Sequence, residues 1–266
     1  DLVEYISERQ ARQVRGLIQS REITPTFAII NTDPENLVIK TYLKFKRARA
    51  KELGINLQVL EVSQDEAEGA IKKLSLDSNV HGIILQLPLK DPTQTDRLLN
   101  LIPATKDVDG LSKQTIVQPA TAQAILWLLA GFNVELKGQK ILVVGQGRLV
   151  GAPLTKLLKD QGLNVNVIDD KNSPKELIEA IKNADILISA TGQAGLIKPE
   201  MLHSGQIIID AGTSESDGEV LGDLDPSVYS SNLDLKVSAK IGGLGPLTIS
   251  CLYENLLQLI DQTLQK

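Results

Sequence analysis

Short apolar segments rich in β-branched residues alternate with segments of helical periodicity along most of the chain. In the first half, the segments that predict strands are 27–30, 56–62 and 82–87, and those between them predict helices over about 36–53 and 64–75. Strands that alternate with helices in this way usually pair in parallel, with the helices packed on the sheet. The first half of the chain is therefore expected to form an α/β layer.

The pattern restarts after a strongly apolar helix predicted over 121–133, which is typical of a connector between domains. The strands predicted beyond it are 140–144, 164–168, 185–189 and 206–210, and the helices are 149–161 and 174–182. This order is typical of a nucleotide-binding α/β layer. A final helix follows a glycine-rich loop and is expected to pack back on the first domain. The expected domains are thus 1–120 with 246–266, and 121–245 including the connecting helix.

Composition and charge narrow the classes of partner. The chain has 266 residues, of which 42% are hydrophobic and 23% are charged, as in ordinary soluble globular proteins. The net charge is −5 and the one basic run, 40–51, is short, which argues against nucleic acid as a main partner. This basic run either binds an anionic small molecule or is a solvated helix face.

Cysteine content and hydropathy bear on location. No apolar run approaches the roughly 20 residues that span a bilayer, so no membrane association is expected. The single cysteine, Cys251, excludes an internal disulfide framework and fits a cytoplasmic location. With only two histidines in the chain, no metal site is expected either.

Lys46 stands where an amphipathic helix usually has an apolar residue. At helical spacing it shares a face with Leu43, Ala50 and Leu53, and Tyr42 lies one turn before it. Such a lysine commonly covers the core with its methylenes while its ammonium reaches water. The alternative is a partly desolvated amine in a cleft, whose pKa falls far enough for proton transfer near neutral pH.

Three further segments combine polar groups or glycines with predicted turns. Gln86 ends a buried strand just before Pro88, where its amide either finds partners in the core or faces a cleft and orients an amine. The segment KDVDG, 106–110, offers two aspartates, although turn aspartates commonly bind only nearby backbone amides. The segment KIGGLGPLT, 240–248, either lines a flat ligand or forms a rigid turn.

The segment VVGQGRLVG has the position of a phosphate-binding loop. Gly145, Gly147 and Gly151 lie between a predicted strand and the next helix, where backbone amides can approach a pyrophosphate. Asp169 and Asp170 close the following strand, where an acid binds the ribose hydroxyls of adenosine. The acidic pair would repel a 2′-phosphate, which favours NAD over NADP. The alternative is a tight turn with surface aspartates.

Four stretches in this order, YLKFKRARAKELGI, QLPL, KDVDG and VGAPL…GGLGPLT, resemble the bifunctional methylenetetrahydrofolate dehydrogenase/cyclohydrolase family. The resemblance covers nearly the whole chain from Tyr42 onward. It implies an α/β fold of two domains, a discontinuous catalytic domain and a Rossmann-like dinucleotide-binding domain with a mostly parallel sheet. It also implies a homodimer that binds a tetrahydrofolate derivative and NAD or NADP.

The resemblance implies oxidation of 5,10-methylenetetrahydrofolate to the methenyl form, followed by hydrolysis to 10-formyltetrahydrofolate. Lys46 would transfer the proton during hydrolysis, and Gln86 would hold the lysine and tune its pKa. Tyr42 would contact the aminobenzoyl ring and act in the catalytic group, while Asp109 would bind the pterin. The other implied folate contacts are Gly242, Gly243 and Pro246, and the implied dinucleotide contacts are Gly145, Gln146, Gly147, Gly151, Asp169, Asp170 and Thr191.

Several positions depart from the usual family residues. Gln146 and Gly147 replace an arginine and a serine of the phosphate loop, and Asp169 and Asp170 stand where a histidine and a serine are usual. Lys240 enters a segment that normally touches the nicotinamide and the folate, where a charge would impede hydride transfer. Two alternatives therefore stay open: a cyclohydrolase with weak or absent dehydrogenase activity, and a non-catalytic folate- or nucleotide-binding protein.

Overall fold

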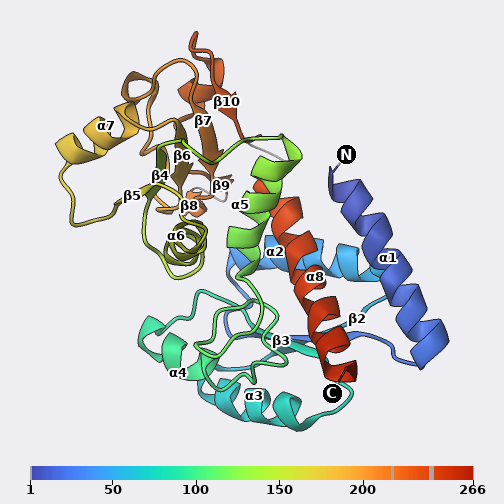
Figure 1. Cartoon of the computed structure of the whole chain (residues 1–266). Coiled ribbons are helices and arrows are strands. Elements are labelled where there is room, and N and C mark those ends of the chain that lie inside the picture. The colour runs from blue at the N-terminus through green and yellow to red at the C-terminus, as the bar shows by residue number, and fades with distance from the viewer. Residues whose placement is uncertain (1, 217–218, 240–242, 266) are drawn as a thin grey trace. The chain divides into compact units, whose positions relative to one another are not determined.

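A computed structural model describes residues 2–216, 219–239 and 243–265, and the chain divides into two compact units (Figure 1). Unit 1 comprises Asp1–Ala120 and Thr248–Lys266, and unit 2 comprises Thr121–Leu247. Unit 1 is therefore built from two separate segments of the chain. Each unit has a parallel sheet with helices, which confirms the expected α/β class.

Unit 1 contains a small parallel sheet and most of the longer helices. Its strands are β1 (Thr26–Asn31), β2 (Asn56–Glu61) and β3 (Gly82–Leu85), in the order β2-β1-β3. Its helices are α1 (Leu2–Arg21), α2 (Leu37–Leu53), η1 (Gln64–Glu66), α3 (Ala67–Leu76), η2 (Pro92–Gln94) and α4 (Thr95–Leu99), together with α8 (Leu244–Leu264) from Thr248 onward. All six residues of the central strand β1 are buried, which explains the apolar run at 27–30 within it.

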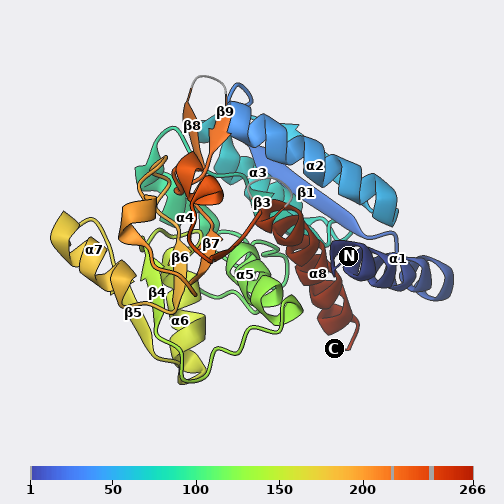
Figure 2. The same ribbon diagram turned by 90° about the horizontal axis from the view of Figure 1, so that it is seen from above.

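Helix α1 was not among the expected elements. The face that it buries includes Ser7 and Gln10 as well as apolar residues, so its apolar periodicity is interrupted. Gln10 Nε2 donates to Ser250 O on α8 at 2.8 Å, and Arg9 pairs with Glu254 at 2.6 Å. Figures 1 and 2 show α1 beside α8, a packing that tertiary polar contacts support.

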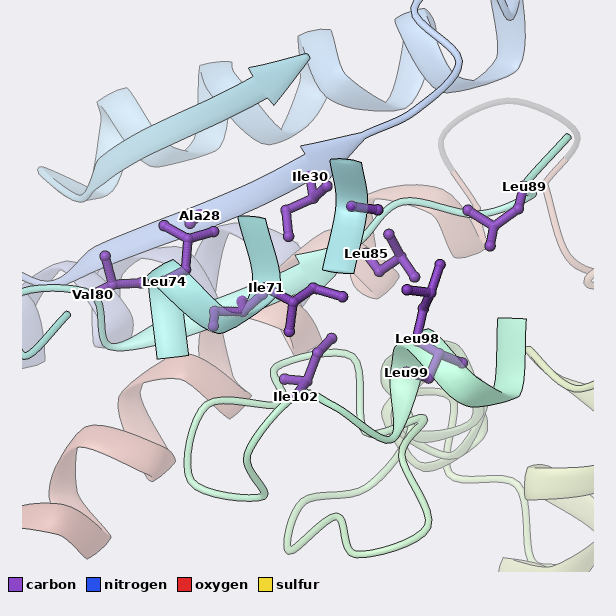
Figure 3. Packing of buried hydrophobic residues seen from close by; sticks show 12 residues of the cluster. Ala28, Ile30, Ile71, Leu74, Val80, Leu85, Leu89, Leu98, Leu99 and Ile102 are labelled. Atoms are coloured by element: carbon purple, nitrogen blue, oxygen red, sulfur yellow. The ribbon is translucent and has the colours of Figure 1, made fainter. Parts of the chain in front are cut away.

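One apolar cluster joins the sheet of unit 1 to the helices beneath it. Figure 3 shows its side chains meeting between strands β1 and β3 and helices α3 and α4. The buried members are Ala28, Ile30, Ala67, Ile71, Leu74, Val80, Ile83, Leu85, Leu89, Leu98, Leu99 and Ile102. Burial of this apolar surface holds β3 in place, and β3 ends directly before Gln86.

Unit 2 is a doubly wound α/β layer. Its main strands are β4 (Ile141–Val144), β5 (Val165–Ile168), β6 (Ile186–Ser189), β7 (Ile207–Asp210) and β10 (Lys236–Val237), all parallel, in the order β10-β7-β6-β4-β5. A separate antiparallel pair is formed by β8 (Ser214–Ser216) and β9 (Glu219–Leu221). The helices are α5 (Ala120–Gly131), α6 (Gly151–Asp160), α7 (Pro174–Lys182), η3 (Pro199–Met201) and η4 (Pro226–Ser230).

The strand order of unit 2 fixes where a ligand would bind. After β4 the chain passes to β5 on one side of it, and then returns to β6 on the other side. In such sheets ligands bind at the carboxyl ends of the two strands where the direction changes, here β4 and β6. The expected strands and helices of this unit are present with small shifts at their ends, whereas β8, β9 and β10 were not predicted because each is only two or three residues long.

We expect Ile71→Ala to lower the free energy of unfolding by about 2–5 kcal/mol, because it removes a fully buried side chain from the cluster of unit 1. The matched control is Leu76→Ala, at the end of the same helix, where the side chain is 88% exposed and the expected change is within about 0.5 kcal/mol. The free energy of unfolding of both variants is measured by denaturant unfolding, with hydrogen exchange at the amides of β1 and β3 as the readout. Equal effects of the two changes would contradict this assignment of the core.

Candidate functional site

Helix α2 carries Lys46 on its inner face. The helix begins at a cap in which Asn36 accepts a hydrogen bond from the backbone N–H of Ile39 at 3.1 Å, and it ends at Gly54, which has a left-handed φ of 77°. Its buried residues are Ile39, Leu43, Lys46, Ala50 and Leu53. Lys46 is only 6% exposed, so its side chain belongs to the interior of unit 1 rather than to its surface.

The amine of Lys46 is held by the amide of Gln86. Lys46 Nζ donates to Gln86 Oε1 at 2.9 Å. Gln86 Nε2 donates to the carbonyl of Leu87 at 2.9 Å, and the backbone N–H of Gln86 donates to Ile30 O at 2.9 Å. The position of Gln86 directly after β3 and the bond from its Nε2 to Leu87 O together fix the side-chain amide with its oxygen toward Lys46 Nζ. Gln86 therefore orients the amine.

The two aspartates of the loop at 106–110 have different interactions. Asp107 is buried, and its carboxylate accepts hydrogen bonds from the backbone N–H groups of Gly110 at 3.1 Å and Ser112 at 2.9 Å. This is the turn-forming role that aspartates often have. Asp109 is partly buried, and its carboxylate interacts electrostatically with Lys46. The loop thus uses Asp107 to hold its shape and leaves Asp109 beside the amine.

Burial pushes both charged partners toward their neutral forms. It lowers the pKa of the Lys46 amine, and the nearby carboxylate of Asp109 partly opposes this shift. Burial likewise raises the pKa of Asp109 to about 6, an effect that Lys46 opposes and Asp107 strengthens. A group whose pKa is brought toward the working pH is suited to proton transfer. The cluster of Lys46, Gln86 and Asp109 therefore has the electrostatics of an acid–base site.

Two residues of α8 support this cluster and were not predicted. The hydroxyl of Tyr253 donates to the carbonyl of Lys46 at 2.7 Å. Asn255 Nδ2 donates to Val108 O and to Gln118 O, each at 2.9 Å. Both residues lie within an apolar helical pattern, so their sequence carries no signal beyond helix periodicity. Tyr42, by contrast, is partly exposed on α2, one turn before Lys46.

The glycines after β4 permit close backbone contacts. Gly145 has a φ of 92°, and a Cβ added to it would lie 2.4 Å from Ala190 O. A Cβ on Gly151 would lie 1.9 Å from Gly145 O, whereas one on Gly147 would meet nothing within 4 Å. Gln146 Nε2 donates to Gly145 O and to Thr155 Oγ1, each at 3.0 Å. Gly145 and Gly151 are therefore required by packing, and Gly147 is not.

The other predicted dinucleotide contacts follow the neighbouring strands. Asp169 comes after β5, and its carboxylate accepts a hydrogen bond from the backbone N–H of Lys171 at 3.0 Å, while Asp170 is exposed. Thr191 follows β6, and its backbone N–H donates to Asp223 at 2.7 Å. Because β5, β4 and β6 are adjacent and parallel, their carboxyl ends bring these residues and the glycine loop to one edge of the sheet.

The remaining predicted contacts lie near the start of α8. Gly242 and Lys240 fall outside the described residues. A Cβ on Gly243 would lie 2.4 Å from Ala239 O, so a side chain does not fit there, and Pro246 lies in the first turn of α8. Both belong to unit 2, whereas the Lys46 cluster belongs to unit 1.

Neither a metal-binding cluster nor a membrane-spanning helix occurs in the part of the chain that the structure describes. Within the described ranges, no group of three or more histidine, cysteine, aspartate or glutamate side chains is arranged to hold a metal ion. Among those same residues, no helix is long and apolar enough to cross a bilayer.

Models of protein families match both halves of the chain. The model described as the catalytic domain of tetrahydrofolate dehydrogenase/cyclohydrolase matches residues 1–109. The model described as the NAD(P)-binding domain of the same enzymes matches residues 119–264. A curated relative, the bifunctional protein FolD of Lactobacillus helveticus, is 34% identical over 257 residues, which cover 91% of this chain and 89% of the relative.

Solved structures of the same kind of enzyme share the fold. The bifunctional methylenetetrahydrofolate dehydrogenase/cyclohydrolase FolD from Campylobacter jejuni has a TM-score of 0.88 and 29% identity, covering 98% of this chain and 96% of that chain. FolD from Trypanosoma brucei, solved in complex with NADP cofactor and an inhibitor, has a TM-score of 0.89 and 26% identity, covering 99% and 96%. The similarity therefore extends over both units.

Replacing Lys46 by methionine should raise the pKa of Asp109 above about 6, because the cation that lowers it is removed while burial remains. Carbon-13 NMR of protein labelled at its aspartate carboxyl groups measures this titration. Lys44→Met, at an exposed position of the same helix, is the control and should leave the pKa unchanged. A pKa that stays the same or falls in Lys46→Met would show that the two groups do not interact.

Proposed function

This chain belongs to the tetrahydrofolate dehydrogenase/cyclohydrolase family, and on that premise we propose which of its residues carry out the two reactions. The enzyme oxidises 5,10-methylenetetrahydrofolate to the methenyl form with a nicotinamide dinucleotide, and then hydrolyses the product to 10-formyltetrahydrofolate. Membership of the family favours this bifunctional enzyme over the two alternatives that the sequence left open. The residue assignments below are our proposal.

Lys46 is the group that transfers protons during hydrolysis. The observation that carries this assignment is the hydrogen bond of 2.9 Å between Lys46 Nζ and Gln86 Oε1 inside unit 1. The methenyl substrate is a cation, which together with burial favours the neutral amine. The neutral amine accepts a proton from the attacking water as the C–O bond forms. The resulting ammonium gives that proton to the ring nitrogen as the C–N bond breaks and the ring opens. The hydroxyl oxygen forms the C=O bond of the formyl group at the same time, and its proton passes to the amine and from there to water.

Gln86 and Asp109 set the state of this amine. The amide oxygen of Gln86 accepts from Lys46 without adding a negative charge, so it orients the nitrogen and does not lock it in the charged form. Asp109, whose pKa is raised to about 6, is mostly ionised at neutral pH and accepts hydrogen bonds from the N–H groups of the pterin. Tyr42, one helical turn before Lys46, contacts the aminobenzoyl ring.

The edge of the sheet in unit 2 binds the dinucleotide. The backbone of Gly145, Gln146 and Gly147 and the start of α6 at Gly151 surround the pyrophosphate. Thr191 contacts the cofactor from the loop after β6. Asp169 and Asp170 lie near the adenosine ribose, where an acid binds the hydroxyls of NAD and repels the 2′-phosphate of NADP. NAD is therefore the preferred cofactor.

Two further properties implied by the family resemblance belong to the same proposal. The enzyme works as a homodimer formed through its nucleotide-binding domains. It is located in the cytoplasm, where its single cysteine, which is buried, stays reduced.

Lys46→Met should lower the rate of methenyltetrahydrofolate hydrolysis by at least about a hundredfold, because general acid–base assistance is worth that much or more. Hydride transfer should persist, so the methenyl compound should accumulate and be visible by its absorbance. Lys44→Met should hydrolyse the substrate like the wild type. A rate for Lys46→Met within about twofold of the wild type would exclude the proposed role.

Asp170→Ser should improve use of NADP relative to NAD by about fivefold in kcat/KM, because one negative charge near the 2′-phosphate is removed from an exposed position. Asp170 is the better probe of the pair, since the carboxylate of Asp169 also holds the turn. Asp160→Ser, at the far end of α6, removes the same charge as a control. A wild-type enzyme that prefers NADP, or no change in Asp170→Ser, would contradict the proposed preference.

A further inference from the structure

A buried carboxylate holds the loop that follows β6. Asp223 is fully buried, and its Oδ2 accepts hydrogen bonds from Ser189 Oγ and from the backbone N–H of Thr191, each at 2.7 Å. Its Oδ1 accepts from the backbone N–H of Gln193 at 3.0 Å. One side chain, distant in sequence, therefore fixes the last residue of β6 and two amides of the loop after it.

Asp223 is itself held by a second aspartate. Asp210 Oδ1 accepts from the backbone N–H of Asp223 at 3.0 Å, and its Oδ2 accepts from that of Leu224 at 3.1 Å. Each carboxylate also fills the space beside a glycine. A Cβ on Gly212 would lie 1.9 Å from Asp223 Oδ1, and one on Gly222 would lie 2.1 Å from Asp210 Oδ2. The two aspartates thus form an interlocked pair with little freedom to shift.

The loop that Asp223 holds forms one wall of the glycine loop after β4. A Cβ added to Gly145 would lie only 2.4 Å from the carbonyl oxygen of Ala190, so the two loops are in close contact there. The N–H groups of Thr191 and Gln193 bind Asp223, so they serve to fix the loop and are not free for a phosphate. The position of this wall decides how much room remains beside Gly145 for a ligand.

We propose that Asp223 is a positioning residue for the dinucleotide: it does not touch the cofactor, but it sets the loop at 190–193 against the glycine loop and so determines the affinity for the cofactor. The inference rests on the dinucleotide site proposed above. In Asp223→Asn, the side-chain N–H₂ group would face a backbone N–H donor of the loop. The loop would then move away from residue 223 to separate the two donors. Binding of the dinucleotide would weaken, while the chemistry on bound cofactor would be preserved.

The test is a steady-state comparison of the wild type with Asp223→Asn and Ser189→Ala. In Asp223→Asn we expect the KM for the preferred dinucleotide, and its Kd by calorimetry, to rise at least about tenfold. The kcat at saturating dinucleotide should stay within about threefold, and hydrolysis of methenyltetrahydrofolate should be unchanged. Ser189→Ala, which removes one of the three bonds, should raise the KM by about threefold.

Asp185→Asn is the matched control. Its carboxylate accepts from the backbone N–H of Lys140 at 2.7 Å, before β4 and β6 begin, at the opposite edge of the same sheet. It should leave the dinucleotide KM unchanged. A merely structural Asp223 would lower the unfolding temperature without changing the KM or Kd, and that result would overturn the proposal.

The outcomes separate this proposal from the function on which it rests. A wild-type enzyme that transfers no hydride to NAD or NADP and binds neither would contradict the dinucleotide site itself, and the role of Asp223 with it. An active wild type with an unchanged KM in Asp223→Asn would overturn the positioning role alone. If Asp223→Asn does not fold, Ser189→Ala decides: an unchanged KM in that variant also overturns the proposal.

Discussion

The arrangement of polar groups around Lys46 in unit 1 depends on one constraint, the removal of its amine from water. Burying a charged group is costly unless it is hydrogen-bonded or paired, and Lys46 has one neutral acceptor in Gln86 and one carboxylate neighbour in Asp109. Neither partner cancels the effect of burial, so the amine and the carboxyl group are both held away from their usual pKa values. The caps of α2, the end of β3 and the turn around Asp107 keep these groups together in that state.

Three carboxylates, those of Asp107, Asp109 and Asp223, show two kinds of environment. Asp107 and Asp223 accept hydrogen bonds from backbone N–H groups of their surroundings, so each fixes a loop. Asp109 instead faces a side chain of opposite charge, and its proton equilibrium responds to what happens at Lys46. The same residue type therefore either fixes a loop or has a protonation state that depends on a neighbouring charge, according to which groups surround it.

The sequence predicted the features that arise from local patterns. The alternation of strands and helices, the inward position of Lys46 on α2 and the glycine loop after β4 all follow from spacing along the chain. Helix α1 escaped prediction because Ser7 and Gln10 interrupt its buried face. The support from Tyr253 also escaped, since its bond joins residues 207 positions apart and leaves no local trace. Asp223 was missed for a similar reason, because its partners at the end of β6 and in the loop after it are more than thirty residues away.

The discontinuous construction of unit 1 has a consequence for how the protein is made. The anchors that α8 provides for Lys46 and for the loop at 106–110 come from Tyr253 and Asn255. During synthesis the ribosome completes all of unit 2 before it reaches these residues. Until this last helix is made, Lys46 and the loop at 106–110 lack its hydrogen bonds. The surroundings of Lys46, Gln86 and Asp109 are therefore completed last, although these three residues are translated first.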